Sequence, residues 1–478
     1  MVAGTRPTFF AIVATALDPV NPICRSTPVW LVAFATVATP VRAQTHQPSA
    51  GAAAPAATAS PQADSAREAR AAYRRSVVAY RNRDVANARR EMATAAAWWP
   101  TQQVYLEGAA RLAALARDTA DAARWLGRLA DLGIGAPVDR DTTFRAFSGA
   151  AVFDAAISRL RLATAPVPRS RVRLTLSDTM LHPEGIALDA RTGRWFVGSV
   201  RQRRVVVVER DGSAHDFVRA GGDGIAGVFG MAVDAMRRTL WVATTGLPRM
   251  EGFTSPDSGR VGVNGYDLDS GRLRRMAWMA RDSSTAHTFG DVAVAPTGDV
   301  YVSDSQAPWI ARLPLGGDSL ERFVTHPLFR SLQGMAITPD GRTMFVADYS
   351  HGLLRIDLAS RSVTPLGAPP NATLLGVDGL YLHRGALIGV QNGVTPPRLA
   401  RFCLDAAGRR VRRVETLDRN PSLVDEPTLG AISGDSVFYV ATSQWEKFDD
   451  DGKRITGAGL RPATVVGLVL DGKAACDL

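Results

Sequence analysis

The sequence predicts a multidomain protein in which an all-α module of tetratricopeptide-like helical repeats precedes an all-β six-bladed propeller. Two internal repeats lead to this prediction: apolar residues at helical spacing that recur within residues 65–165, and six similar strand-rich copies within residues 171–478. The length of 478 residues agrees with it, because one hydrophobic core seldom organises a chain of this size.

The strand-rich copies share a pattern in which a glycine is followed by alternating apolar residues, a turn, and a second strand that contains an aromatic residue or valine. The copies are PEGIALDARTGRWFVGS from Pro183, FGMAVDAMRRTLWVAT from Phe229, FGDVAVAPTGDVYVSDS from Phe289, QGMAITPDGRTMFVADYS from Gln333, DGLYLHRGALIGVQNG from Asp378 and TLGAISGDSVFYVATSQW from Thr428. Their starts lie about 43 to 60 residues apart, the length of a four-stranded blade. We expect the ring to close when either residues 171–176 or residues 465–470 join the sixth blade.

The helical repeats are visible in residues 65–165, which are rich in Ala, Arg and Leu. Ala88 and Met92 recur as Ala122 and Leu126. The offset is about 34 residues, the period of a tetratricopeptide repeat. We expect two helical hairpins and a partial third, which either pack against the propeller as a spacer or offer a groove to a protein partner.

The N-terminal segment has the pattern of an export signal. An apolar stretch over residues 30–37 precedes Val41-Arg42-Ala43, whose valine and alanine suit a signal peptidase. We therefore expect a signal peptide over residues 1–43 and a periplasmic or secreted mature protein, with an uncleaved membrane anchor as the alternative. Residues 44–64 are rich in Ala, Pro, Ser and Gln, which is typical of a disordered linker.

Cysteine content and charge bear on a possible disulfide and on nucleic-acid binding. Without the signal peptide two cysteines remain, Cys403 and Cys476, which either pair in an oxidising compartment or stay as thiols. The net charge of +10 comes almost wholly from arginines spread along the whole chain. A nucleic-acid-binding surface would need these residues concentrated on one face, so we expect no nucleic-acid partner.

The six copies also predict which side chains meet at the mouth of the central channel, because each copy places one residue at the start of its innermost strand. These residues are Glu184, Phe229, Gly290 with Asp291, Gln333, Asp378 and Thr428. Several carboxylates in one channel are unfavourable unless their charge is compensated. A divalent cation with oxygen ligands, most simply Ca²⁺, would compensate it.

With Glu184 in the first copy and Asp378 in the fifth, residues 171–471 resemble the gluconolactonase/regucalcin family of six-bladed propellers. The resemblance implies one divalent metal held by Glu184, Gln333 and Asp378, where Gln333 stands in place of the family's asparagine. It also implies that Asp378 is the catalytic base and that Asp291 orients the substrate.

Two further residues at the mouth are candidates for substrate binding: Thr428, in the sixth copy, and His182, which lies close to Glu184 in the sequence. Glu426 could reach the channel in place of Thr428. The function that the resemblance implies is an exported metal-dependent hydrolase of lactones or small esters. The alternative is a non-catalytic periplasmic propeller that binds a ligand or a protein partner, with the helical repeats as a docking module.

Overall fold

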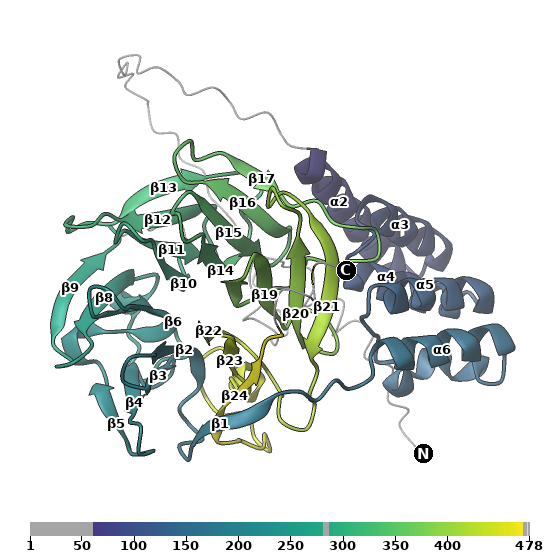
Figure 1. Cartoon of the computed structure of the whole chain (residues 1–478). Helices are drawn as coiled ribbons and strands as arrows, with labels where there is room; N and C mark the ends of the chain where they lie inside the picture. The colour runs from purple at the N-terminus through teal and green to yellow at the C-terminus, as the bar shows by residue number, and fades with distance from the viewer. Residues whose placement is uncertain (1–60, 281–285, 472–475, 477–478) are drawn as a thin grey trace, which may run out of the picture.

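A computed structural model of the chain describes residues 61–280, 286–471 and 476, and it shows a helical module followed by a six-bladed β-propeller (Figure 1). The expected signal peptide and most of the expected linker lie outside the described residues. The linker prediction was wrong for residues 61–64, which form the first turn of a helix. Proline is tolerated there and Asp64 favours the positive end of the helix dipole. Within the described ranges, no helix has the length and apolar character needed to cross a membrane.

The helical module is built from antiparallel neighbours whose ends are fixed by similar caps. Asp84 and Asp118 each accept a hydrogen bond from a backbone N–H in the first turn of the next helix. The alanines that follow, Ala88 and Ala122, are fully buried and allow the helices to approach closely. The elements are α2 (Pro61–Arg81), α3 (Val85–Trp98), α4 (Gln103–Leu115), α5 (Thr119–Asp131), the 3₁₀ segments η1 (Val138–Arg140) and η2 (Thr142–Phe147), and α6 (Ala151–Ala163).

The propeller consists of six four-stranded antiparallel sheets whose first strands surround the axis (Figure 1). Blades one to three contain β2 (Pro183–Asp189), β3 (Arg194–Ser199), β4 (Arg204–Val208) and β5 (Ala214–Val218); β6 (Gly227–Asp234), β7 (Thr239–Thr245), β8 (Val261–Asp267) and β9 (Leu273–Trp278); β10 (Phe289–Val294), β11 (Val300–Asp304), β12 (Trp309–Leu313) and β13 (Glu321–Thr325). Blades four and five contain β14 (Leu332–Ile337), β15 (Thr343–Asp348), β16 (Gly352–Asp357) and β17 (Val363–Pro365); β18 (Leu380–His383), β19 (Ala386–Gln391), β20 (Arg398–Leu404) and β21 (Val411–Asp418).

The sixth blade closes the ring with strands from both ends of the propeller sequence. It contains β22 (Gly430–Ser433), β23 (Ser436–Val440) and β24 (Ala463–Val469), and β1 (Arg171–Leu176) is its outermost strand. The sequence predicted that either residues 171–176 or residues 465–470 would close the ring. In the structure both segments belong to the sixth blade, where they pair with each other as antiparallel strands. Cys403 of β20, in blade five, and Cys476 form a disulfide with Cα atoms 5.5 Å apart.

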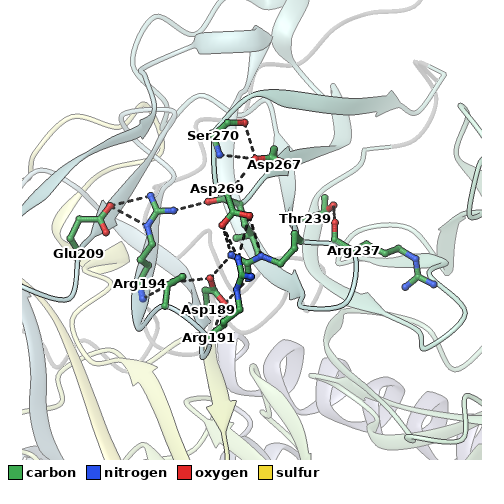
Figure 2. Close-up of polar contacts among 12 residues, drawn as sticks. Asp189, Arg191, Arg194, Glu209, Arg237, Thr239, Asp267, Asp269 and Ser270 are labelled. Carbon is green, nitrogen blue, oxygen red and sulfur yellow. Dashed lines mark hydrogen bonds and ion pairs between the residues drawn. The ribbon is translucent and has the colours of Figure 1, made fainter.

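A network of ion pairs joins blades one and two at the end of the channel opposite the start of β2 (Figure 2). Arg238 donates to both oxygens of Asp189, at 2.9 and 2.8 Å, and also pairs with the exposed Asp269 at 2.7 Å. The Asp189 side chain is only 1% exposed, whereas that of Asp269 is 54% exposed. Burial opposes ionisation of Asp189, but the hydrogen bonds from Arg238, Thr192 and the Arg191 N–H together with the charge of Arg238 outweigh it and lower the pKa of Asp189 to about 2.

Replacing Arg238 by alanine is therefore expected to lower the free energy of unfolding by about 3 kcal/mol, because it leaves the buried Asp189 carboxylate without its cation. Urea denaturation of both proteins at pH 7 measures the difference. Arg191→Ala is the matched control, since the Arg191 side chain pairs only with the exposed Asp269 in this network, its backbone N–H bond to Asp189 is kept in the variant, and the change should matter by less than about 1 kcal/mol. Equal losses in the two variants would contradict the assignment of stability to the buried pair.

Candidate functional site

The pairing of the inner strands shows which residues are equivalent at the channel mouth. In blades one to four the register shifts at the start of the inner strand, between Pro183 and Ile186 in blade one, for example. The first residue inside the shift is Glu184, Phe229, Gly290 and Gln333 in blades one to four, and the strand pairing places Asp378 and Thr428 at the same level in blades five and six. Asp291 takes the next position, where the neighbouring blades have glycine.

Glu184 has a buried carboxylate, and side chains in the described part of the chain donate hydrogen bonds to one of its two oxygens. Its Oε2 accepts hydrogen bonds from the indole Nε1 of Trp445 at 2.6 Å and from the hydroxyl of Ser443 at 3.0 Å. Both donors lie on the long connection between β23 and β24. Burial, and then the charge of Asp378, raise the pKa of Glu184 well above its usual range. The two carboxylates are therefore near enough to repel each other when both are ionised.

Asp378 is paired with an amide that the sequence analysis missed. The Asn392 Nδ2 donates to Asp378 Oδ2 at 2.7 Å and to the carbonyl of Pro427 at 2.8 Å. The Asn392 Oδ1 is buried and accepts no hydrogen bond from the described part of the chain. Burial raises the pKa of Asp378 to about 7. The available signal was the position of Asn392 directly after the second strand of the fifth copy, at the level of the channel mouth.

Asp291 binds the neighbouring blade. Its Oδ2 accepts a hydrogen bond from the backbone N–H of Met335 at 3.1 Å, so the side chain links blades three and four. Burial raises the pKa of Asp291 to about 7, and the charge of Asp378 contributes to the shift. Tyr381 is affected by both carboxylates: burial and the charges of Asp291 and Asp378 raise its pKa well above the usual range, and its hydroxyl accepts a hydrogen bond from the Gly430 N–H.

Gln333 and Glu426 occupy the rest of the polar side. The Gln333 Nε2 donates to Ser331 at 3.2 Å, which leaves the amide oxygen available. Gly290 makes room for it, because a Cβ at position 290 would lie 3.4 Å from the Gln333 Oε1 and 2.8 Å from the Ser305 hydroxyl. Burial raises the pKa of Glu426 to about 7, and its charge adds to the shift of Glu184, so Glu426 lies near the site without displacing Thr428.

The side chains of Thr428 and His182 contact other parts of the protein and are not exposed at the channel mouth. The Thr428 hydroxyl donates to the backbone carbonyl of Glu184 at 2.8 Å and ties blade six to blade one. His182 is fully buried, edge-on to Trp445 with ring centroids 4.4 Å apart and stacked on Phe448 at 5.2 Å. Burial, and then the charges of Arg249 and Arg201, lower the pKa of His182 to about 3. A substrate could reach this imidazole only if the covering rings moved.

The opposite side of the mouth is apolar. Trp445 packs with Val200 and Phe229 in a small cluster, with Leu247 partly buried against it. Arg249 fixes the tryptophan from outside, because its guanidinium lies 5.1 Å from the indole ring and donates to the Trp445 carbonyl at 2.7 Å. The mouth thus combines carboxylates and amides on one side with aromatic rings on the other, and Glu184 lies at the boundary.

The donor set suits a hard cation. No group of three His, Cys, Asp or Glu side chains in the described ranges is placed to hold a metal ion. The oxygens at hand are instead two carboxylates and the amide oxygens of Gln333 and Asn392, the ligand type that Ca²⁺ takes.

One surface hollow lies elsewhere, beside Arg74 and Asn82 on the helical module. We place the site at the channel mouth because the convergent carboxyl groups with raised pKa values are there.

Comparisons with known proteins add likenesses of fold. No family model and no curated protein matches the chain. A gluconolactonase from Xanthomonas campestris is 16% identical, with a TM-score of 0.39, over 63% of this chain and 94% of that one. A calcium-binding regucalcin from Agrobacterium tumefaciens is 13% identical, with a TM-score of 0.43, over 62% and 93%. A virginiamycin B lyase from Staphylococcus aureus is 13% identical, with a TM-score of 0.42, over 63% and 100%.

These low identities and TM-scores carry no argument about chemistry. The protein is a six-bladed β-propeller with an N-terminal helical module, and propellers of the gluconolactonase and regucalcin type are among the solved structures that it resembles.

Proposed function

We propose that this protein is an exported, metal-dependent hydrolase of lactones or small esters, with a divalent cation, most simply Ca²⁺, at the channel mouth. One observation carries the proposal: Glu184 and Asp378 are buried and would repel each other when both are ionised, and no group in the described part of the chain donates a hydrogen bond to the buried Asn392 oxygen beside them. A bound cation would offset both carboxylate charges and occupy the unused oxygen.

Glu184, Asp378 and Gln333 would hold the cation, and Asn392 joins this set. Such an ion supplies Lewis-acid polarisation of a substrate carbonyl. Asp378 then acts as the base: its carboxylate takes a proton from water while the water oxygen bonds to the carbonyl carbon. The same proton passes to the departing alkoxide oxygen when the ester bond breaks. Burial, which raises the pKa of Asp378 to about 7 in the metal-free protein, favours this role because it opposes the lowering of the pKa by the cation and keeps the carboxyl able to accept and release protons.

The apolar side of the mouth bears on the kind of substrate. Trp445 and the more deeply buried Phe229 exclude water from the side of Glu184 that they cover, and the part of Trp445 that stays exposed would contact an alkyl or aryl group next to the reacting carbonyl. A lactone or ester with an apolar substituent fits such a mouth better than a polyhydroxylated one, whose hydroxyl groups would lose their hydrogen bonds against these rings.

Export is part of the same proposal. The disulfide between Cys403 and Cys476 supports it, since disulfides persist mainly in oxidising compartments such as the periplasm or the exterior of the cell. The expected signal segment at residues 1–43 would deliver the chain there.

Metal content and thermal melting test the proposal directly. Elemental analysis of the purified protein is expected to find about one divalent metal per chain, and calcium at a hundred times its dissociation constant should stabilise the metal-free protein by about 2.7 kcal/mol. Asp378→Ala should lose both the metal and the shift. A protein without metal and without a calcium-dependent shift would contradict the proposal and favour the non-catalytic alternative, a propeller that binds a ligand or partner.

A further inference from the structure

The helical module contacts two loops of blade five at the face of the channel mouth. Figure 1 shows the helices beside β20 and β21 of that blade. Leu375 and Val394, one from each loop, are buried in the same apolar cluster as the helices themselves, at 6% and 4% exposure. The core of the helical module is therefore completed by side chains of the propeller.

These two loops are the ones that carry the blade-five half of the site. Leu375 lies three residues before Asp378, and Val394 lies two residues after Asn392. The loops also touch each other, since the Gly393 N–H donates to the Gly376 carbonyl at 3.0 Å. A Cβ on Gly376 would lie 2.6 Å from the Gly393 Cα, so only glycine allows this approach.

Polar contacts fix the second loop to the helices. The Thr395 N–H donates to the side chain of the buried Gln103, at the start of α4, at 3.0 Å. The Thr395 carbonyl accepts from the N–H of Gly135 at 2.5 Å. Both backbone groups of Thr395 are thus satisfied by the helical module and not by the propeller.

A third contact leads back to the strand that precedes Asn392. The buried Arg398 donates to the carbonyl of Gly133 at 3.2 Å and to the side chain of Gln391 at 2.7 Å. Gln391 in turn donates to the carbonyl of Leu375 at 2.7 Å. The loop before Asp378, the strand end at Asn392 and the turn after α5 therefore form one connected network.

We propose that the helical module is a positioning element for the channel site: through Leu375, Val394 and Thr395 it fixes the two loops that set Asp378 and Asn392 against each other. The module then serves the site from within the chain instead of acting as a free docking arm. Its effect on a bound cation rests on the proposed function, whereas its effect on loop order does not.

A matched pair of variants tests this role. Val394→Ala and Val77→Ala remove the same atoms from the same apolar cluster, in which both valines are buried, but only Val394 lies on a site loop. Hydrogen exchange of the full chain is the first readout. We expect Val394→Ala to speed exchange of the amides of residues 373–397 at least tenfold and to leave the inner strand of blade one unchanged. Val77→Ala should change residues 373–397 less than twofold.

Calcium titration by calorimetry is the second readout. Val394→Ala is expected to weaken calcium binding at least fivefold and Val77→Ala less than twofold. Equal effects of the two variants on loop exchange would overturn the positioning role. If the wild-type protein binds no calcium, the proposed function fails while the exchange comparison still decides the positioning role.

A second pair of variants tests the same role if Val394→Ala does not fold. Gln103→Ala removes the side-chain acceptor of the Thr395 N–H, and Ser76→Ala removes a buried hydrogen bond to the Ala88 carbonyl within α2 and α3. Faster exchange of residues 373–397 in Gln103→Ala alone is the expected result, and the same exchange in both variants would overturn the proposal.

Discussion

Asp378→Asn is expected to lower kcat for lactone or ester hydrolysis about a thousandfold, within the range that a general base contributes. Asparagine keeps the shape of the side chain and can still accept the hydrogen bond from Asn392. It cannot take a proton from water, and it removes one of the two charges that would hold a cation. The loss should therefore appear in kcat measured at saturating calcium, so that weaker metal binding is separated from the missing base.

The pH profile gives this prediction a second readout. Burial raises the pKa of Asp378 to about 7 in the metal-free protein, and a bound cation favours the ionised carboxylate, so the activity of the calcium-loaded wild-type protein should rise with pH through a midpoint below about 7 as this carboxyl loses its proton. Asp425→Asn is the control: Asp425 is a rim carboxylate, 42% exposed, near Lys447, and its replacement should leave both kcat and the profile unchanged. An Asp378→Asn variant that retains more than about a tenth of the activity would remove Asp378 from the role of base.

The propeller was predictable from the sequence because its signal is repeated. Each copy can be compared with five others, so one irregular turn does not hide the blade pattern. The register of the inner strands places Glu184 and Asp378 at the level of the channel mouth, as the comparison of the copies predicted. Ring closure was less determined. Residues 171–176 and 463–469 are both plausible edge strands, and only the assembled sheet shows that they pair with each other.

The site could be predicted only in part, because it also depends on loops outside the repeated pattern. Trp445 lies on a connection of irregular length between β23 and β24, so no comparison between copies places its indole on Glu184. Asn392 follows a strand at a position where the other copies differ. The expected substrate contacts of Thr428 and His182 stay predictions. The repeated pattern predicts where the backbone of each residue lies, but it does not predict that the Thr428 hydroxyl bonds to blade one or that the His182 ring stacks on Phe448.

The calcium-free protein is expected to lose stability as the pH rises from 5 to 8. The pKa values of Asp378, Asp291 and Glu426 are about 7, and that of Glu184 is also raised, mainly through burial. A carboxyl whose pKa is higher in the folded than in the unfolded chain binds its proton more tightly when folded. Its contribution to stability is therefore complete below the unfolded pKa, near about 4, and is lost as the pH rises through about 7.

One such carboxyl changes the free energy of unfolding by up to about 1.4 kcal/mol per pH unit, so each of these carboxyls should contribute a loss of about 2 kcal/mol between pH 5 and pH 7. Urea denaturation in the presence of a chelator, at intervals across this range, measures it. Asp378→Asn should reduce the slope, because it removes one of the groups that titrate. A stability that stays level or increases over the same range would show that these carboxyls ionise in the folded protein without a penalty.

Calcium separates the carboxyls that would bind it from those that would not. A cation favours the ionised forms of Glu184 and Asp378, so it should stabilise the protein more at pH 8 than at pH 5 and flatten the part of the slope that these two residues cause. Glu426 is outside the proposed ligand set, and its raised pKa has burial and the charge of Glu446 as leading causes. The slope that remains with calcium should therefore decrease in Glu426→Gln, and a Glu426→Gln variant with an unchanged slope in calcium would instead place Glu426 among the groups that the cation neutralises.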